Sequence, residues 1–237
     1  MIMINFFLFF LVLSFFNMDE ANPLKNTSWF LNDKNMNEVR IYSDNFFSST
    51  KYDKDNKKFL STYGGTYLLD EEGYYEVIEF NSNDSSLVGD TIYISRISIN
   101  LNNDNGLMQL DGEKYEKFKN YNSILSGSWL MSGIERGGEI RMRDVNRSRK
   151  TMKILAGGRF QWIAYDINKK GFYGTGGGIF TSENGNYIEN IEFFSRDNSK
   201  VGISLEFNFE VKEGDWHHKG FSSKGDPKYE IWTQRKQ

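Results

Sequence analysis

Paired glutamates are the first candidates for chemistry in this chain of 237 residues. Glu189 and Glu192 lie three residues apart, and Glu76 and Glu79 have the same spacing earlier in the chain. Residues three apart in a β-strand point to opposite faces, so the two carboxylates of one pair cannot act together without a bulge. One glutamate of each pair must then face the interior, where it needs a polar partner or a ligand. We therefore assign no acid/base pair for glycosidase-type chemistry, and no other catalytic residue.

Partners for an inward-facing Glu189 are available on a neighbouring predicted strand, which carries Arg159, Gln161 and Tyr165. One interpretation is a buried Arg–Glu–Tyr network that fixes the strand register. The other is recognition of a ligand, with aromatic side chains that either fill the interior or line an apolar pocket. On the ligand interpretation, the binding residues are Arg159, Gln161, Trp162, Tyr165, Tyr187, Glu189 and His218.

The supply of histidine and cysteine limits metal and nucleophile chemistry, because the chain has no Cys and only two His, His217 and His218. Adjacent residues of a strand point to opposite faces, so both imidazoles cannot ligate one metal ion. A single His inside a barrel can ligate haem iron, which is a minor alternative. Serines are plentiful, but no nucleophile–base pair stands out. We expect no metal, no cofactor and no enzyme activity.

Glycines cluster at Gly174–Gly178 and at Gly64-Gly65. A phosphate-binding loop needs a Lys-Ser/Thr pair and the start of a helix directly afterwards. Here the strand-like segment Ile179–Thr181 follows instead. We therefore predict that the glycines allow sharp bends in a curved sheet.

A basic segment, Arg141–Lys153, contains six Lys or Arg residues against one Asp. Such a segment is either a solvated hairpin or a contact for a polyanion or a cell-envelope partner. The residues predicted for that contact are Arg141, Arg143, Arg147 and Arg149. The net charge of −3 argues against nucleic acid as the partner. The sequence does not define an oligomeric state.

The N-terminal 21 residues include an apolar run, Ile4–Phe16, that is too short to span a bilayer but fits the core of a secretory signal peptide. No Lys or Arg precedes the run, and a buried N-terminal strand or helix is the alternative. We expect residues 1–21 to be a signal peptide. The mature protein is then exported, and is periplasmic, secreted or peripherally associated with the envelope.

The remaining chain contains an internal repeat. Residues 39–89 align without a gap with residues 152–202, and 19 of the 51 positions are identical. Apolar and polar residues alternate, turn signals recur at short intervals, and no segment keeps a helical period. We expect an all-β protein of two tandem antiparallel up-and-down β-barrels, residues 22–120 and 121–237. Two halves of one barrel are the alternative.

Several motifs resemble those of lipocalins and related calycins. In that family a Gly-x-Trp on the first strand closes the barrel base and a late Arg packs across the indole. Trp129 and Arg235 stand at matching positions here, and Trp29 begins the first unit. RFQWIAY, FYGTGGG, IENIEFFSRD and GDWHHKG resemble duplicated lipocalin-like exported proteins of Bacteroidetes. The resemblance covers nearly all of residues 22–237 and implies a lipocalin-like fold and export, but no established activity.

These patterns predict non-enzymatic binding of a small, partly apolar ligand, with the second unit as the binding unit. Burial of the apolar part of the ligand would supply affinity, and Arg159 or Glu189 would fix a polar head. The alternative is a cell-envelope interaction or structural module whose barrels are filled and which acts through its surface.

Overall fold

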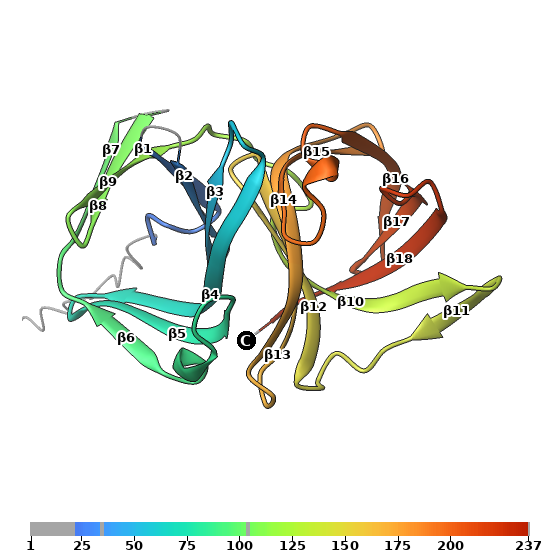
Figure 1. Ribbon diagram of the computed structural model, residues 1–237, viewed down its shortest axis with the longest axis horizontal. Coiled ribbons are helices and arrows are strands. Elements are labelled where there is room, and N and C mark those ends of the chain that lie inside the picture. Colours follow the sequence, from blue (N-terminus) through green and yellow to red (C-terminus); the bar gives the residue numbers. More distant parts are fainter. Residues whose placement is uncertain (1–21, 34–35, 103–104, 237) are drawn as a thin grey trace, which may run out of the picture.

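Antiparallel β-strands make up most of the protein in a computed structural model that describes residues 22–33, 36–102 and 105–236. The expected signal peptide, residues 1–21, lies outside the described residues. The strands form two nine-stranded sheets, one from each half of the chain, which lie side by side (Figure 1). The predicted all-β fold of two tandem antiparallel up-and-down β-barrels is confirmed, with one half closed into a barrel and the other a curled half-barrel sheet.

The first half forms a curled up-and-down sheet. Its elements are β1 (Thr27–Asp33), β2 (Met36–Tyr42), β3 (Phe46–Asp53), β4 (Lys58–Asp70), β5 (Gly73–Asn81), the 3-10 helix η1 (Ser85–Leu87), β6 (Thr91–Ile94), β7 (Ile97–Asn102), β8 (Asn105–Leu110) and β9 (Glu113–Lys117). Neighbouring strands follow the order β6-β5-β4-β3-β2-β1-β9-β8-β7, so β1 joins both β2 and β9.

The second half forms a closed barrel. Its elements are β10 (Gly127–Arg136), β11 (Glu139–Met142), β12 (Arg149–Ala156), β13 (Arg159–Asp166), β14 (Gly171–Glu183), β15 (Asn186–Phe194), the 3-10 helix η2 (Asn198–Lys200), β16 (Ser204–Lys212), β17 (Asp215–Phe221) and β18 (Pro227–Gln234). Because β10 pairs with both β12 and β18, eight strands close on themselves. β11 extends from the barrel as a hairpin with β10 (Figure 1).

The first sheet is interrupted where β6 and β7 follow one another. Ile92 and Ile94 pack against the core of the first half, and so do Ile97 and Ile99. The inward positions therefore change from even to odd numbers across Ser95-Arg96, which one regular strand cannot accommodate on a single face. β6 stays paired with β5 and β7 with β8, whereas β16 in the second half is continuous and pairs with both of its neighbours.

Element bounds in the two halves correspond at one constant offset. β3, β4 and β5 begin and end 113 residues before β13, β14 and β15, and η1 precedes η2 by the same number. The offset is that of the aligned sequence segments. Matched positions therefore occupy equivalent strands, and the two interiors can be compared residue by residue.

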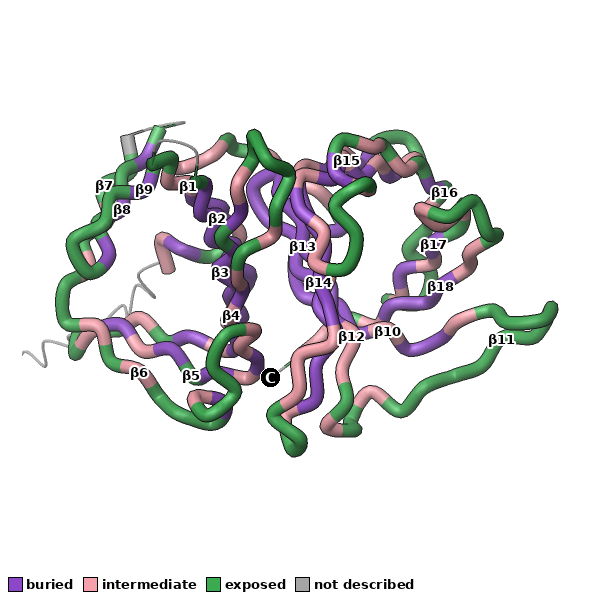
Figure 2. The backbone as a smooth tube through the Cα atoms, viewed as in Figure 1, coloured by how far each residue is buried: buried purple, intermediate pink, exposed green. Residues whose placement is uncertain are grey.

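A shared hydrophobic core joins the two halves. Val39, Ile41 and Tyr52 of the first half are buried in one cluster with Met152 and Ile154 of the second. Buried stretches gather in the strands that lie between the halves (Figure 2). β12 and β13 are thus covered on both faces, by the barrel interior on one side and by the first half on the other.

Matched β-bulges lie at the predicted glycine bends. The strand register shifts at Gly64-Gly65 in β4 and at Gly177-Gly178 in β14. A Cβ atom on the second glycine of either pair would overlap a backbone carbonyl oxygen of the next strand, so both positions require glycine. The extra residue opposite each pair is a glutamate, Glu79 in β5 and Glu192 in β15. The bulges therefore bend the sheets and redirect these two carboxylates.

Candidate functional site

A buried ion pair lies inside the second barrel. Lys153 on β12 donates to Glu189 on β15, with Nζ 2.6 Å from Oε1. Burial lowers the pKa of Lys153, and the two nearby carboxylates oppose this shift. Burial alone would raise the pKa of Glu189, but the Lys153 ammonium holds it below its ordinary value. We infer a charged pair at neutral pH, with Glu189 facing inward as predicted for one glutamate of its pair.

Aromatic rings surround the Lys153 ammonium group. Its Nζ lies 4.9 Å from the ring centroid of Trp216, 5.0 Å from that of Trp232 and 5.1 Å from that of Tyr187. These distances are within the range of cation–π attraction, which is strongest where water is excluded. The Lys153 ammonium group is therefore held in a fixed position in the barrel interior by the rings around it.

His218 and Glu230 form a second polar pair in the same interior. Nδ1 of His218 lies 3.3 Å from Oε2 of Glu230, and both side chains are buried. Burial and the Lys153 charge lower the pKa of His218 to about 4, so its imidazole is neutral at pH 7. Lys228, which is partly exposed, pairs with the other oxygen of Glu230 at 3.0 Å.

A cavity of about 360 Å³ opens onto these polar groups. Trp162, Phe194 and Trp232 are among its apolar lining residues, and Lys153, Glu189 and Glu230 are the charged lining residues that are most buried. Its volume falls within the range of small-molecule sites. The indole Nε1 of Trp232 is buried and has no hydrogen-bond partner among the described residues.

Glycine makes room for the aromatic wall of this cavity. The rings of Trp162 and Phe194 meet edge to face, with centroids 5.5 Å apart. Gly176 lies between them on β14, and a Cβ atom there would come within 2.7 Å of the Trp162 ring and 2.8 Å of the Phe194 ring. Any larger residue at this position would displace one of the two rings.

All seven predicted binding residues lie on strands of the second barrel, and four of them face its interior. Trp162 and Glu189 line the cavity. Tyr187 and His218 are fully buried in the barrel core, where their rings pack with centroids 5.5 Å apart. All four remain predicted ligand-binding residues.

The other three predicted residues point away from this cavity, and the structure corrects the expected partners of Glu189. On β13 the odd-numbered residues Arg159, Gln161 and Tyr165 face the first half, whereas Trp162 faces the barrel interior. The Gln161 side chain, for example, bonds to the hydroxyl groups of Thr50 and Thr62 across the interface, at 3.0 and 2.9 Å. The expectation failed because β13 is buried on both faces, so burial does not reveal which face is the lumen.

Arg–Glu–Tyr networks are present, but they connect the two halves. Tyr165 donates to Glu79 at 2.6 Å, and the matched Tyr52 donates to the matched Glu192 at 2.7 Å. Arg159 forms an ion pair with Glu192. Each half thus supplies a tyrosine to the bulge glutamate of the other, an exchange typical of a two-fold arrangement.

Arg235 likewise belongs to the interface rather than to the position over Trp129 that the lipocalin resemblance implies. Its guanidinium donates to both carboxylate oxygens of Glu79, at 2.8 and 2.7 Å. It also lies 4.1 Å from the ring centroid of Phe46. Trp129 packs instead in the barrel core, edge to face with Trp216 at 5.8 Å.

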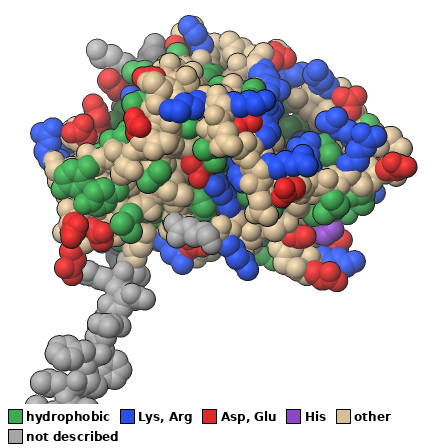
Figure 3. Space-filling model, turned by 90° about the horizontal axis from the view of Figure 1, so that it is seen from below, with side chains coloured by type: hydrophobic (Ala, Val, Ile, Leu, Met, Phe, Trp, Pro, Cys, Tyr) green, Lys and Arg blue, Asp and Glu red, His purple; other side chains and the backbone are tan. Residues whose placement is uncertain are grey.

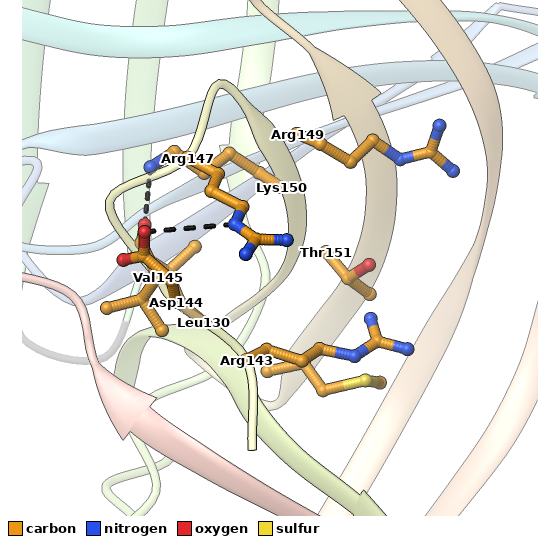
Figure 4. Close-up of a pocket in the computed structure, with 9 residues that line it drawn as sticks. Leu130, Arg143, Asp144, Val145, Arg147, Arg149, Lys150 and Thr151 are labelled. Carbon is orange, nitrogen blue, oxygen red and sulfur yellow. Dashed lines mark hydrogen bonds and ion pairs between the residues drawn. The ribbon is translucent and has the colours of Figure 1, made fainter. Parts of the chain in front are cut away.

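The basic segment, residues 141–153, borders the mouth of the cavity. A second hollow of about 210 Å³ lies within the segment, and Arg143, Arg147, Arg149 and Lys150 are among its lining residues (Figure 4). Arg143 and Arg149 line the barrel cavity as well. The two hollows therefore adjoin, and two features that are separate in the sequence meet at one place.

The described residues contain no group of three or more His, Asp or Glu side chains placed to hold a metal ion. His218 does not fit the role of a haem ligand either. Its ring centroid lies 3.9 Å from that of Phe207, and the rings of Tyr187 and Trp216 pack around it. Within the described barrel, these rings occupy the space that a porphyrin beside the imidazole would need.

Lys153 is the main site residue that the sequence did not reveal, since it ends the basic segment and resembles the exposed cations before it. Its matched position in the first half is Arg40, which forms an ion pair with Glu76, the match of Glu189. A cation and a glutamate at the same two positions of both halves are the signal that identifies an internal ion pair.

No protein-family model matches the chain, and a search of curated proteins found no relative. The resemblance to duplicated lipocalin-like proteins therefore stays a prediction. Within the described part of the chain, no helix has the length and apolar character needed to cross a membrane.

Proposed function

We propose that the protein binds a small, partly apolar molecule, without chemical conversion, in the cavity of the second barrel. The observation that carries this proposal is the cavity of about 360 Å³ that joins an apolar wall to buried charged groups. Trp162 and Phe194 supply flat apolar surface, and burial of ligand against them contributes about 25 cal/mol per Å².

The buried pair of Lys153 and Glu189 forms the floor of the cavity, and it supports a role in orienting a ligand rather than in catalysis. Lys153 is held by Glu189 and by three aromatic rings, so its position is fixed before a ligand arrives. Pre-organised groups of this kind lower the cost of ordering on binding. Glu189 and Lys153 would then present fixed polar groups to the bound ligand, while the aromatic wall holds its apolar part.

Replacement of Trp162 by alanine tests the proposal. The probe is the uncharged fluorophore N-phenyl-1-naphthylamine, titrated into the purified protein. We expect one binding site, and Trp162→Ala should weaken binding about tenfold, since loss of about 60 Å² of apolar contact corresponds to roughly 1.5 kcal/mol. Tyr75→Ala is the matched control, because Tyr75 lies on the first sheet and pairs with exposed Tyr93. A Trp162→Ala protein with unchanged circular dichroism and unchanged affinity would contradict the proposed site.

We further propose that the protein is exported and that its two halves derive from one lipocalin-like unit. The apolar run within residues 1–21 supports export, and the constant offset of 113 between matched strands supports a common unit. N-terminal sequencing of the mature protein tests the first part. An intact Met1 in a cytosolic fraction would refute export.

A further inference from the structure

We infer that the ligand of the second barrel is an amphipathic anion, whose charged head lies at the arginine-lined mouth and whose apolar part lies against the aromatic wall. This inference rests on the proposed function and adds the chemical class of the ligand. The head is a phosphate, sulfate or carboxylate, since these are the groups that guanidinium ions recognise with paired hydrogen bonds.

The residues that line the cavity carry an excess of positive charge, which favours an anionic ligand. Six lining residues are cationic, Arg136, Arg143, Lys153, Arg149, Arg196 and Lys228, and two are anionic, Glu189 and Glu230. The whole chain has a net charge of −3, so this excess of positive charge is local. Lys and Arg side chains also gather over the second barrel on the face shown in Figure 3. A cavity lined by one sign of charge concentrates ligands of the opposite sign.

The cations within the barrel are already neutralised, whereas Arg136, Arg143, Arg149 and Arg196 at the mouth form no ion pair with any described residue. Lys153 and Lys228 each pair with a buried glutamate, at 2.6 and 3.0 Å. Partial burial and the charges of Arg136 and Arg149 lower the pKa of Arg143, and the charge of Glu230 only partly opposes this shift. An anion at the mouth would relieve this repulsion, which places the charged head there rather than at the floor.

Two of the mouth arginines are held in place before any ligand binds. The guanidinium of Arg149 lies 3.5 Å from the ring centroid of Tyr173. Nε of Arg196 donates to the backbone carbonyl of the same tyrosine at 2.8 Å. Neither side chain must be ordered from solution when an anion binds, so less conformational entropy is lost.

The adjoining hollow in the basic segment enlarges the space for the head. Arg143 and Arg149 are shared between the two hollows, and Arg147 and Lys150 lie beyond them (Figure 4). Lys150 donates to the Val145 carbonyl at 2.6 Å, which holds the loop around this hollow. A head of phosphate size can therefore contact the shared arginines while the apolar part extends toward Trp162.

Calorimetric titration of four probes that separate head from body tests the inference. The probes are octyl phosphate, 1-octanol, octyltrimethylammonium and inorganic phosphate. We expect octyl phosphate to bind at least about tenfold more tightly than 1-octanol, and octyltrimethylammonium to bind most weakly of the three octyl compounds. Of the three octyl compounds, added salt should weaken only octyl phosphate, because the mouth arginines are exposed and their charges are screened.

Variants locate the head group. Arg143→Gln/Arg149→Gln should weaken octyl phosphate about tenfold and leave 1-octanol within about twofold. Lys169→Gln/Lys212→Gln is the control, since it removes the same charge from exposed residues that do not line either hollow. Circular dichroism confirms that each variant folds, and the salt titration of the unaltered protein needs no variant.

Each other outcome overturns a different statement. Equal affinities for octyl phosphate and 1-octanol would show that the site does not recognise an anionic head, and would leave the proposed function intact. Equal affinities for octyl phosphate and inorganic phosphate would show a site for free anions and remove the apolar part of the ligand. Failure of both octyl phosphate and 1-octanol to bind would refute the proposed function and this inference with it.

Discussion

Removal of the Lys153 ammonium group should destabilise the second barrel strongly, because it leaves a buried carboxylate without its counter-charge. Glu189 has only 4% of its surface exposed. Loss of one partner of a buried ion pair costs about 3–5 kcal/mol. Methionine in place of Lys153 keeps most of the side-chain volume, so lost packing adds little. We therefore expect Lys153→Met to lower the free energy of unfolding by about 4 kcal/mol, a large part of the total stability of a typical domain.

The double variant Lys153→Met/Glu189→Met separates charge burial from packing. It removes both ions, and replacing a buried pair by apolar residues of similar size is often close to neutral. Urea unfolding followed by circular dichroism gives the free energies of the wild type, both single variants and the double variant. We expect the double variant to be more stable than Lys153→Met by about 2 kcal/mol or more.

An exposed pair provides the control for this experiment. Arg96 and Asp111 are 3.0 Å apart with side chains 76% and 70% exposed, so Arg96→Met should cost less than about 1 kcal/mol. If Lys153→Met were no less stable than the double variant, the buried carboxylate would not need its partner. The assignment of a charged pair to the barrel interior would then be wrong.

Two further predictions concern the interface and the response to pH. Tyr165→Phe should lower the free energy of unfolding by about 2 kcal/mol, because it removes a hydrogen bond to the carboxylate of Glu79; Tyr75→Phe on the first sheet should change the urea midpoint little, and equal effects of the two would contradict the bridging role. For His218, the folded pKa of about 4 lies below the ordinary value of 6.5, so the unfolded chain binds the extra proton between these values and stability falls as pH drops through that window, by up to roughly 3 kcal/mol. Urea midpoints at pH 7 and pH 4.5 should therefore differ less in His218→Gln than in the wild type, and identical pH profiles would show that the imidazole is not buried in its neutral form.

The fold was predictable from the sequence because strand alternation and glycine positions are local signals. The glycines at Gly64-Gly65 and Gly177-Gly178 follow from the need to bend a sheet, and the structure places bulges there. The inward direction of one glutamate in each pair followed from the spacing alone. The sequence also contains the signal for the interruption between β6 and β7. The inward-facing apolar residues are even-numbered before Ser95-Arg96 and odd-numbered after it.

The residues of the candidate site were less predictable, because the strands that carry them are buried on both faces. Alternation tells an observer which residues share a face, but not whether that face meets the lumen or the other half of the protein. Arg159, Gln161 and Tyr165 share one face of β13, and only packing of the two halves shows that this face is the interface. The partner of Glu189 was hidden for another reason, since Lys153 lies in a segment whose other cations are mostly exposed.

The two interiors show how one ion pair is used in two ways. In each half, a row of four cross-strand neighbours begins at the internal cation. The rows are Arg40, Ser49, Tyr63 and Asn81 in the first half, and Lys153, Trp162, Gly176 and Phe194 in the second.

In the first half, Tyr63 of this row contacts the cation Arg40. Arg40 donates to the hydroxyl groups of Tyr42 and Tyr63, each at 2.9 Å, in addition to its ion pair with Glu76. Glycine takes the place of that tyrosine in the second half, and Trp162 and Phe194 flank it. Within this row, the aromatic ring contacts the cation in the first half, whereas in the second half the aromatic rings flank the glycine. The first half also has a hollow, of about 410 Å³, which Tyr63 and Glu76 line. The exchanges of Ser49, Tyr63 and Asn81 for Trp162, Gly176 and Phe194 give only the cavity of the second barrel an aromatic wall in this row, and this is why we place ligand binding there.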